Sequence, residues 1–109
     1  MFIADPSKPP ADVFMYTLHP TRLDMLTKGS TDAEKALAGQ HWMRSIELLK
    51  KGVIMFAGRT VDTTAESHAT VVFRAKSEEE ARTIMNGDPA VKGGLFRARL
   101  FRYQPMLME

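Results

Sequence analysis

Four segments of the chain are rich in the aromatic and β-branched residues typical of β-strands, and turn-forming or charged residues bound each of them. They span residues 13–18, 53–57, 68–74 and 95–103. The second segment is apolar throughout, which predicts a buried strand. Residues 1–12, which hold three of the six prolines, are expected to form an arm without regular structure. The domain is therefore predicted to span residues 13–103, and residues 104–109 form a tail.

The longest predicted helix begins with a capping pattern. Thr31 is followed three residues later by Glu34, so each side chain can accept a hydrogen bond from the other residue's backbone amide. This pattern predicts a helix over residues 31–51, which Gly52 ends. Its inward stripe recurs at helical spacing and contains Leu37, His41, Arg44 or Ser45, and Leu48, with Ala36, Ile46 and Leu49 beside it. His41 stands where an apolar residue is expected.

The remaining segments join these elements. A second capping pattern, Ser77-Glu-Glu-Glu80, begins a shorter helix that runs through Met85 and ends at Asn86-Gly87. Residues 21–30 are predicted to form a loop with room for one helical turn. Residues 88–94 contain Asp-Pro and Gly-Gly, which predict a turn or a single-turn helix.

The resulting order, β-α-β-β-α-β, is that of the ferredoxin-like fold. It predicts an α+β domain with a four-stranded antiparallel sheet and both helices on one face. Alternation along the first strand gives both sheet faces an apolar character, with Phe14, Tyr16 and Leu18 on one side and Val13, Met15 and Thr17 on the other. The uncovered face needs a partner, and a second copy of the chain is the simplest one. We therefore expect a homodimer in which two sheets face each other.

Composition narrows the class of protein. A chain of 109 residues forms one domain, and a net charge of +2 gives only a weak electrostatic field. The absence of cysteine excludes disulfides, thiolate metal sites and a cysteine nucleophile. No apolar run approaches the ~20 residues that span a bilayer, and the first residues lack a signal-peptide pattern. We expect a cytoplasmic protein with no membrane partner. Its eight methionines fit either adaptable core packing or the lining of an apolar pocket.

His41 and Asp88 are the candidates for catalysis. A neutral imidazole beside a cleft is a common general acid or base, because it titrates near working pH. The alternative is a core histidine held by one hydrogen bond. Asp88 precedes Pro89, which is common turn chemistry. Asp88 becomes a catalytic candidate if the fold brings it to His41, because a carboxylate bonded to one ring nitrogen fixes the imidazole tautomer.

Other polar residues are candidates for binding. We expect Arg22, Arg59 and Tyr16 to contact the substrate, although Arg22 also suits a structural role and Arg59 an exposed strand end. A solvated strand edge is the simpler interpretation, and anion binding the lesser one, for three interleaved arginines, Arg97, Arg99 and Arg102. Metal-ligand spacing is absent from the three histidines, His19, His41 and His68. We therefore expect no metal and no cofactor.

RNA-recognition domains share this order of elements. Those domains place aromatic residues on the central strands within a Lys/Arg-Gly-Phe-type motif. Here the third strand contains Ala69-Thr-Val-Val-Phe-Arg-Ala75, which lacks the Gly-aromatic pair, and no Lys or Arg run exceeds two residues. We therefore expect no nucleic-acid partner.

Several motifs occur together in a recognisable order. They are His41 on the first helix, Gly52 at its end, Gly58 closing the second strand, Ser77-Glu-Glu-Glu-Ala-Arg at the second helix start, and Asp88-Pro-Ala-Val-Lys-Gly-Gly94 before the last strand. In this order the chain resembles the YCII-related (YciI-like) family over about residues 13–103. It differs from the short family form by a longer insert over residues 21–30.

The resemblance implies a dimeric α+β barrel built from two ferredoxin-like subunits, with a His–Asp pair in a cleft at His41 and Asp88. One branch of the family is similar to a dehydrochlorinase of chlorinated hydroxyhydroquinones, but the insert argues against transferring that reaction. We expect a cofactor-free enzyme that acts on a small aromatic or carbonyl-containing molecule by elimination, isomerisation or hydrolysis. The alternative is a non-catalytic small-molecule-binding or accessory protein on the same dimeric scaffold.

Overall fold

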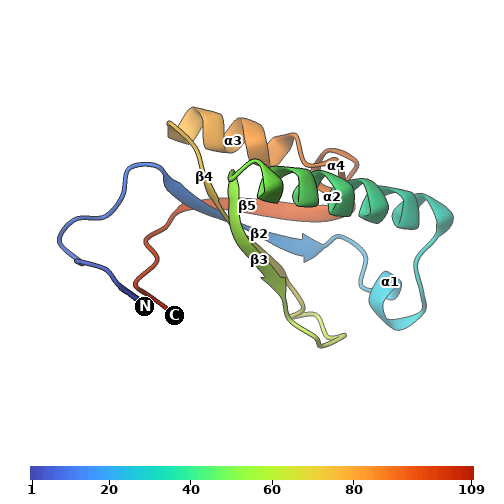
Figure 1. The fold of residues 1–109 in the computed structure, drawn as a ribbon. Coiled ribbons are helices and arrows are strands. Elements are labelled where there is room, and N and C mark those ends of the chain that lie inside the picture. Colours follow the sequence, from blue (N-terminus) through green and yellow to red (C-terminus); the bar gives the residue numbers. More distant parts are fainter.

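The computed structural model describes all 109 residues and contains one four-stranded antiparallel sheet (Figure 1). Its strands are β2 (Val13–Pro20), β3 (Ile54–Arg59), β4 (Ala69–Arg74) and β5 (Phe96–Arg102). They lie in the order β3-β4-β2-β5, so β2 and β4 are the central strands. This is the strand order of the ferredoxin-like fold, and the predicted α+β class and βαββαβ arrangement are confirmed.

Four helices complete the domain. They are α1 (Asp24–Thr27), α2 (Asp32–Lys50), α3 (Glu78–Asn86) and α4 (Pro89–Lys92). The helices α2, α3 and α4 cover one face of the sheet, and α1 lies in the connection between β2 and α2 (Figure 1). Helix α2 has 19 residues, yet none of them is fully buried. No helix combines the length and the apolar character needed to cross a membrane.

The helix starts form as their capping residues predict. The hydroxyl of Thr31 accepts a hydrogen bond from the Glu34 amide at 3.1 Å, and the Glu34 carboxylate accepts one from the Thr31 amide at 2.8 Å. At α3 only half of the expected box is present. The Ser77 hydroxyl accepts from the Glu80 amide, but the Glu80 carboxylate accepts from the amide of Lys76.

The core lies between the sheet and its helices. One face of β2 and β4 supplies its aromatic and aliphatic residues, and α3 closes it from above. Its largest buried members are Phe14, Tyr16, Leu18, Val71, Phe73 and Met85. The inward stripe predicted for α2 holds, because Leu37, His41, Arg44, Ser45 and Leu48 are all half-buried. The sequence therefore predicts the covered side of α2 correctly.

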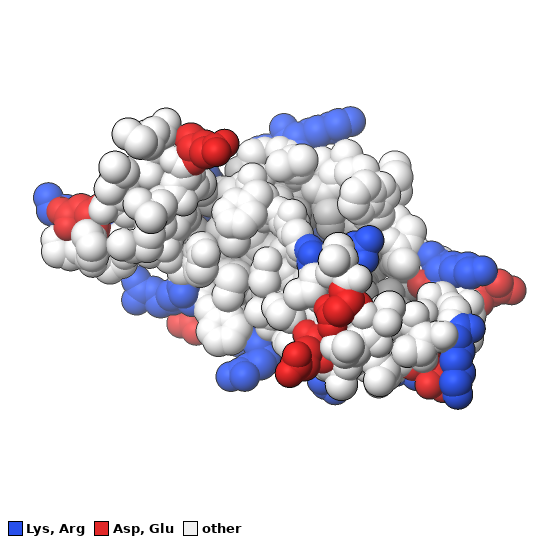
Figure 2. Space-filling model, turned by 90° about the horizontal axis from the view of Figure 1, so that it is seen from below, with Lys and Arg blue, Asp and Glu red and all other residues white.

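The opposite face of the sheet has no helix over it. Cross-strand pairing places one apolar row on this face, formed by Phe56, Val72, Met15 and Phe101. Phe56 is 44% exposed and Phe101 is 37% exposed. Figure 2 looks onto the molecule from this side, where much of the surface carries no charge and most charged side chains lie toward the edges. We call this surface the open face.

The two ends of the chain pair with each other. Strand β1 (Phe2–Ile3) runs antiparallel to β6 (Leu107–Met108), and the Ala4 amide donates to the Met106 carbonyl at 2.8 Å. The expectation that the first twelve residues lack regular structure is therefore wrong in this segment. Two-residue strands give no periodicity that a sequence pattern could reveal.

The end of α4 is packed closely against α2. A Cβ atom on Gly93 would lie 2.9 Å from the Pro89 carbonyl oxygen and would collide with the Leu37 side chain. We expect Gly93→Ala to lower the free energy of unfolding by about 1–3 kcal/mol. Gly39→Ala, on the exposed side of α2 where a Cβ meets nothing within 4 Å, should raise it by up to about 1 kcal/mol. Urea denaturation of both variants measures the difference, and equal effects would contradict the packing argument.

Candidate active site

His41 and Asp88 form a hydrogen-bonded pair across 47 residues of sequence. The Nδ1 atom of His41 lies 2.8 Å from both carboxylate oxygens of Asp88. His41 extends from the inward stripe of α2, and Asp88 immediately precedes α4. The Asp88 side chain is 1% exposed, whereas the His41 side chain is 21% exposed. The pair therefore has a buried carboxylate and a partly accessible imidazole.

Two further donors hold the carboxylate of Asp88. The Tyr16 hydroxyl donates to Oδ2 at 2.8 Å, and the Ala90 amide donates to Oδ1 at 3.0 Å as the cap of α4. Burial acts to raise the pKa of Asp88, but the hydrogen bond and charge of His41, together with the Tyr16 and Ala90 donors, outweigh it and hold this pKa below its ordinary value. Asp88 is therefore an ionised acceptor at neutral pH.

An ionised carboxylate can only accept hydrogen bonds, so the Nδ1 atom of His41 carries the hydrogen of the pair. The second ring nitrogen, Nε2, makes no hydrogen bond within the chain. The edge of the His41 ring packs against Phe96, with the ring centres 6.1 Å apart. One helical turn along α2, the Ser45 hydroxyl donates to the His41 carbonyl. The local structure thus fixes the ring and leaves Nε2 free.

The position of Tyr16 differs from the expected substrate contact. Tyr16 belongs to the core, and its hydroxyl is enclosed against Asp88. Burial and the neighbouring Asp88 carboxylate raise the pKa of Tyr16 well above its ordinary value, although Arg44 opposes this effect. The phenol therefore remains a donor to Asp88 and orients it from below.

Sequence reasoning did not identify Arg44 as a site residue. Its Nη2 donates to the Ile84 carbonyl at 3.0 Å, beside Gly87 and one residue before Asp88. Arg44 lies three residues after His41 on the same side of α2. Its signal was a charged residue at a stripe position, which a solvated helix edge would explain equally well.

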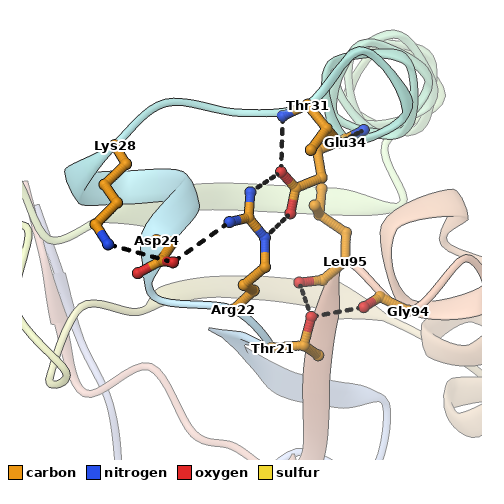
Figure 3. Close-up of polar contacts among 8 residues, drawn as sticks. All are labelled: Thr21, Arg22, Asp24, Lys28, Thr31, Glu34, Gly94 and Leu95. Atoms are coloured by element: carbon orange, nitrogen blue, oxygen red, sulfur yellow. Dashed lines mark hydrogen bonds and ion pairs between the residues drawn. The ribbon is translucent and has the colours of Figure 1, made fainter.

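Arg22 belongs to the insert and is held by Glu34 rather than left free for a ligand (Figure 3). Its Nε donates to the Glu34 carboxylate at 3.0 Å, and its Nη2 contacts the other oxygen. The bond with Arg22 and the Thr31 amide lower the pKa of Glu34 to about 2. The Thr21 hydroxyl also donates to the carbonyls of Gly94 and Leu95. These contacts fasten the insert to the start of α2 and to β5.

The insert lies close to the pair. Met25, in α1, is buried against Ala90 and Leu95, and Leu37 and Phe96 pack around this small cluster. Phe96 is the residue that contacts the His41 ring, and Ala90 caps onto Asp88. The insert therefore supports both sides of the His41–Asp88 pair.

The surface hollows of the molecule lie elsewhere. Five of them have volumes from about 180 to about 650 Å³, and neither His41 nor Asp88 lines any of these. Arg59 lines one of about 260 Å³ at the ends of β3 and β4. No group of three or more His, Asp or Glu side chains is arranged to hold a metal ion.

Comparison with known proteins identifies the class. The chain matches the YCII-related domain over residues 14–102 and therefore belongs to that family. A similar solved structure is the 5-chloro-2-hydroxyhydroquinone dehydrochlorinase from Burkholderia phenoliruptrix AC1100, in complex with 2,5-dihydroxybenzoquinone. The TM-score is 0.54 at 17% identity, over 84% of this chain and 93% of that chain, which establishes a shared fold. No curated protein matches the sequence significantly.

Replacement of Asp88 tests the charge of the pair. Near neutral pH, we expect Asp88→Asn to lower the free energy of unfolding by about 1–3 kcal/mol, because an amide cannot accept from all the donors. The pKa of folded Asp88 lies below the ordinary 3.8, so its ionised form stabilises the fold above 3.8 and this contribution is lost as pH falls through the lower folded value. Urea unfolding of both proteins across this acidic range should show the difference shrinking. A constant difference would contradict an ionised, hydrogen-bonded Asp88.

Proposed function

We propose that this chain is a cofactor-free enzyme that acts on a small aromatic or carbonyl-containing molecule. His41 acts as the general acid and base, and Asp88 orients it. The observation that carries the proposal is the 2.8 Å pair in which Nδ1 is committed to a buried carboxylate while Nε2 is free. An imidazole held in this way is ready to accept a proton at Nε2.

The proposed chemistry follows the proton. The Nε2 atom takes a proton from a carbon or oxygen of the substrate, and the Asp88 carboxylate stabilises the imidazolium that forms. In an elimination, the electrons of the broken bond form a new double bond and a leaving group departs with its own bonding pair. In an isomerisation, the imidazolium returns the proton to another atom of the same molecule. In a hydrolysis, the proton comes from the attacking water.

The surroundings of the pair support an aromatic or otherwise flat apolar substrate. Phe96 and Leu37 are partly buried apolar residues beside it. The insert is fastened over the same side, so we propose that it forms a wall of the substrate site and influences substrate choice. The dehydrochlorinase with the shared fold was solved with a hydroxylated quinone, which makes such compounds suitable first probes.

The test is a turnover and thermal-shift screen of hydroxylated quinones, phenols, aromatic acids and lactones. For a compound that is converted, we expect His41→Asn to reduce kcat by about 100-fold or more, since proton transfer contributes on this scale. An amide at residue 41 can still donate to Asp88, so the melting temperature should change little. Gln40→Ala, an exposed neighbour on the same helix, should retain full turnover.

Two results would oppose this proposal. Full turnover in His41→Asn would remove His41 from the chemistry. Ligands that stabilise the protein without conversion, with binding unchanged in Asp88→Asn, would favour the non-catalytic binding protein instead. That alternative draws support from the five hollows, none of which is lined by the pair in a single chain.

We further propose that two copies of the chain associate through their open faces. The row of Met15, Phe56, Val72 and Phe101 exposes aromatic surface that a second sheet would remove from water. Membership of the YCII-related family is consistent with this arrangement, because the resemblance implies a dimeric barrel. The cytoplasmic location stays a prediction.

Light scattering after size-exclusion chromatography tests the association. The native chain should have twice its monomer mass of 12.2 kDa, and Phe101→Glu should reduce it to one chain by placing a charge on the apolar row. Trp42→Glu is the matched control, because Trp42 is an exposed aromatic residue on α2, at 65%. Loss of the dimer in the Trp42 variant alone would place the interface on α2 instead.

A further inference from the structure

A group of basic side chains lies on the open face, next to the apolar row. The pairing register places His19 opposite Arg97 and Thr17 opposite Arg99. The ring of His68 stacks on that of His19, with 5.6 Å between ring centres and 26° between ring planes. Strands β2 and β5 and the residue before β4 therefore bring two imidazoles and two guanidinium groups to one end of the same face.

These side chains have almost no partners within the chain. The side chains of His19, Arg97 and Arg99 are absent from all of its hydrogen bonds and ion pairs, and Arg99 only lies over the Phe101 ring at 5.3 Å. The Nδ1 atom of His68 donates to the Glu66 carbonyl at 2.8 Å, which leaves its Nε2 free. The group thus presents several donors and no carboxylate that neutralises them.

A polar hollow adjoins this group. It measures about 260 Å³ and is lined by Gly58, Arg59, Thr60, His68 and Thr70, so it contains no acidic and no apolar side chain. His68 belongs both to the hollow and to the ring stack. Close by, the buried hydroxyl of Thr17 has no hydrogen-bond partner, and Thr17 pairs with Thr70 on one side and Arg99 on the other. The surface here combines shape, positive charge and unused hydrogen-bonding capacity.

We propose that His19, His68, Arg59, Arg97 and Arg99 form a binding site for a small molecule that carries a phosphate or carboxylate group. Guanidinium forks match the paired oxygens of both groups, and imidazole nitrogens add further donors. The site lies on the sheet face opposite the His41–Asp88 pair. It is therefore independent of the proposed catalytic function, and its failure would leave that function untouched.

The site is more specific than a solvated strand edge. A strand edge presents charges along one strand, whereas these residues converge from three strands and the adjoining connection onto one hollow. Arg102 is the useful contrast. It pairs with Phe14, so it lies on the helix-covered side of the sheet and at the opposite end of β5. A general attraction between anions and a basic protein would depend on Arg102 as much as on Arg97 and Arg99.

Isothermal titration calorimetry with sodium phosphate and with sodium benzoate, against chloride at matched ionic strength, tests the site. We expect the native protein to bind at least one of the two oxyanions, and the tighter one assigns the ligand group. The double variant R97Q/R99Q should bind it about tenfold or more weakly, because charge-assisted hydrogen bonds are lost. Arg102→Gln removes one charge and should bind like the native protein. All these arginines are exposed, so the variants are expected to fold.

Imidazole resonances provide the second measurement. Addition of the bound oxyanion should shift the ring signals of His19 and His68 in the NMR spectrum and leave those of His41 in place. Absence of binding to either oxyanion would overturn the proposal. An equal loss in Arg102→Gln, or a shift at His41 alone, would also overturn it, since the anion would then be bound by general charge or at the other face.

Discussion

The buried carboxylate of Asp88 sets the geometry of this domain. A charge with almost no access to water is tolerated only when donors surround it, and here they come from three separate elements. His41 donates from α2, Tyr16 from β2 and the Ala90 amide from α4. Because all three bonds converge on one carboxylate, the longest helix, a central strand and the last helix are fixed relative to one another. The same bonds define which nitrogen of His41 remains available, so stability and reactivity share one set of contacts.

Local chemistry accounts for the parts of the fold that could be predicted. The Thr31–Glu34 box involves residues three positions apart, and the apolar runs of β2 to β5 need only neighbouring residues to be recognised. The strand order then follows from the βαββαβ sequence of elements. Both interpretations of Asp88 prove compatible, because the residue caps α4 as turn chemistry requires and also binds His41. Its position near His41 was expected from the family resemblance, and residue spacing alone could not provide it.

Other contacts were beyond sequence reasoning because they depend on where separate elements meet. Tyr16 was expected to face a ligand, but strand alternation alone cannot say that its hydroxyl ends against Asp88. Arg22 was expected near a cleft, and its partner Glu34 was known only as a capping residue. The β1–β6 pairing joins residues at opposite ends of the chain through strands too short to show a period. In each case the residue type was informative, and the partner was a property of the tertiary structure.

Strand β2 separates two chemically different surfaces by a single residue step. Tyr16 points into the core toward Asp88, and Thr17 lies on the opposite side between Thr70 and Arg99. Insertion or deletion of one residue before Tyr16 within this strand would exchange the two sides, presenting a threonine to the carboxylate and a phenol to the open face. Length variation among relatives should therefore be confined to the connections, such as the one that contains α1, while the spacing within β2 stays constant.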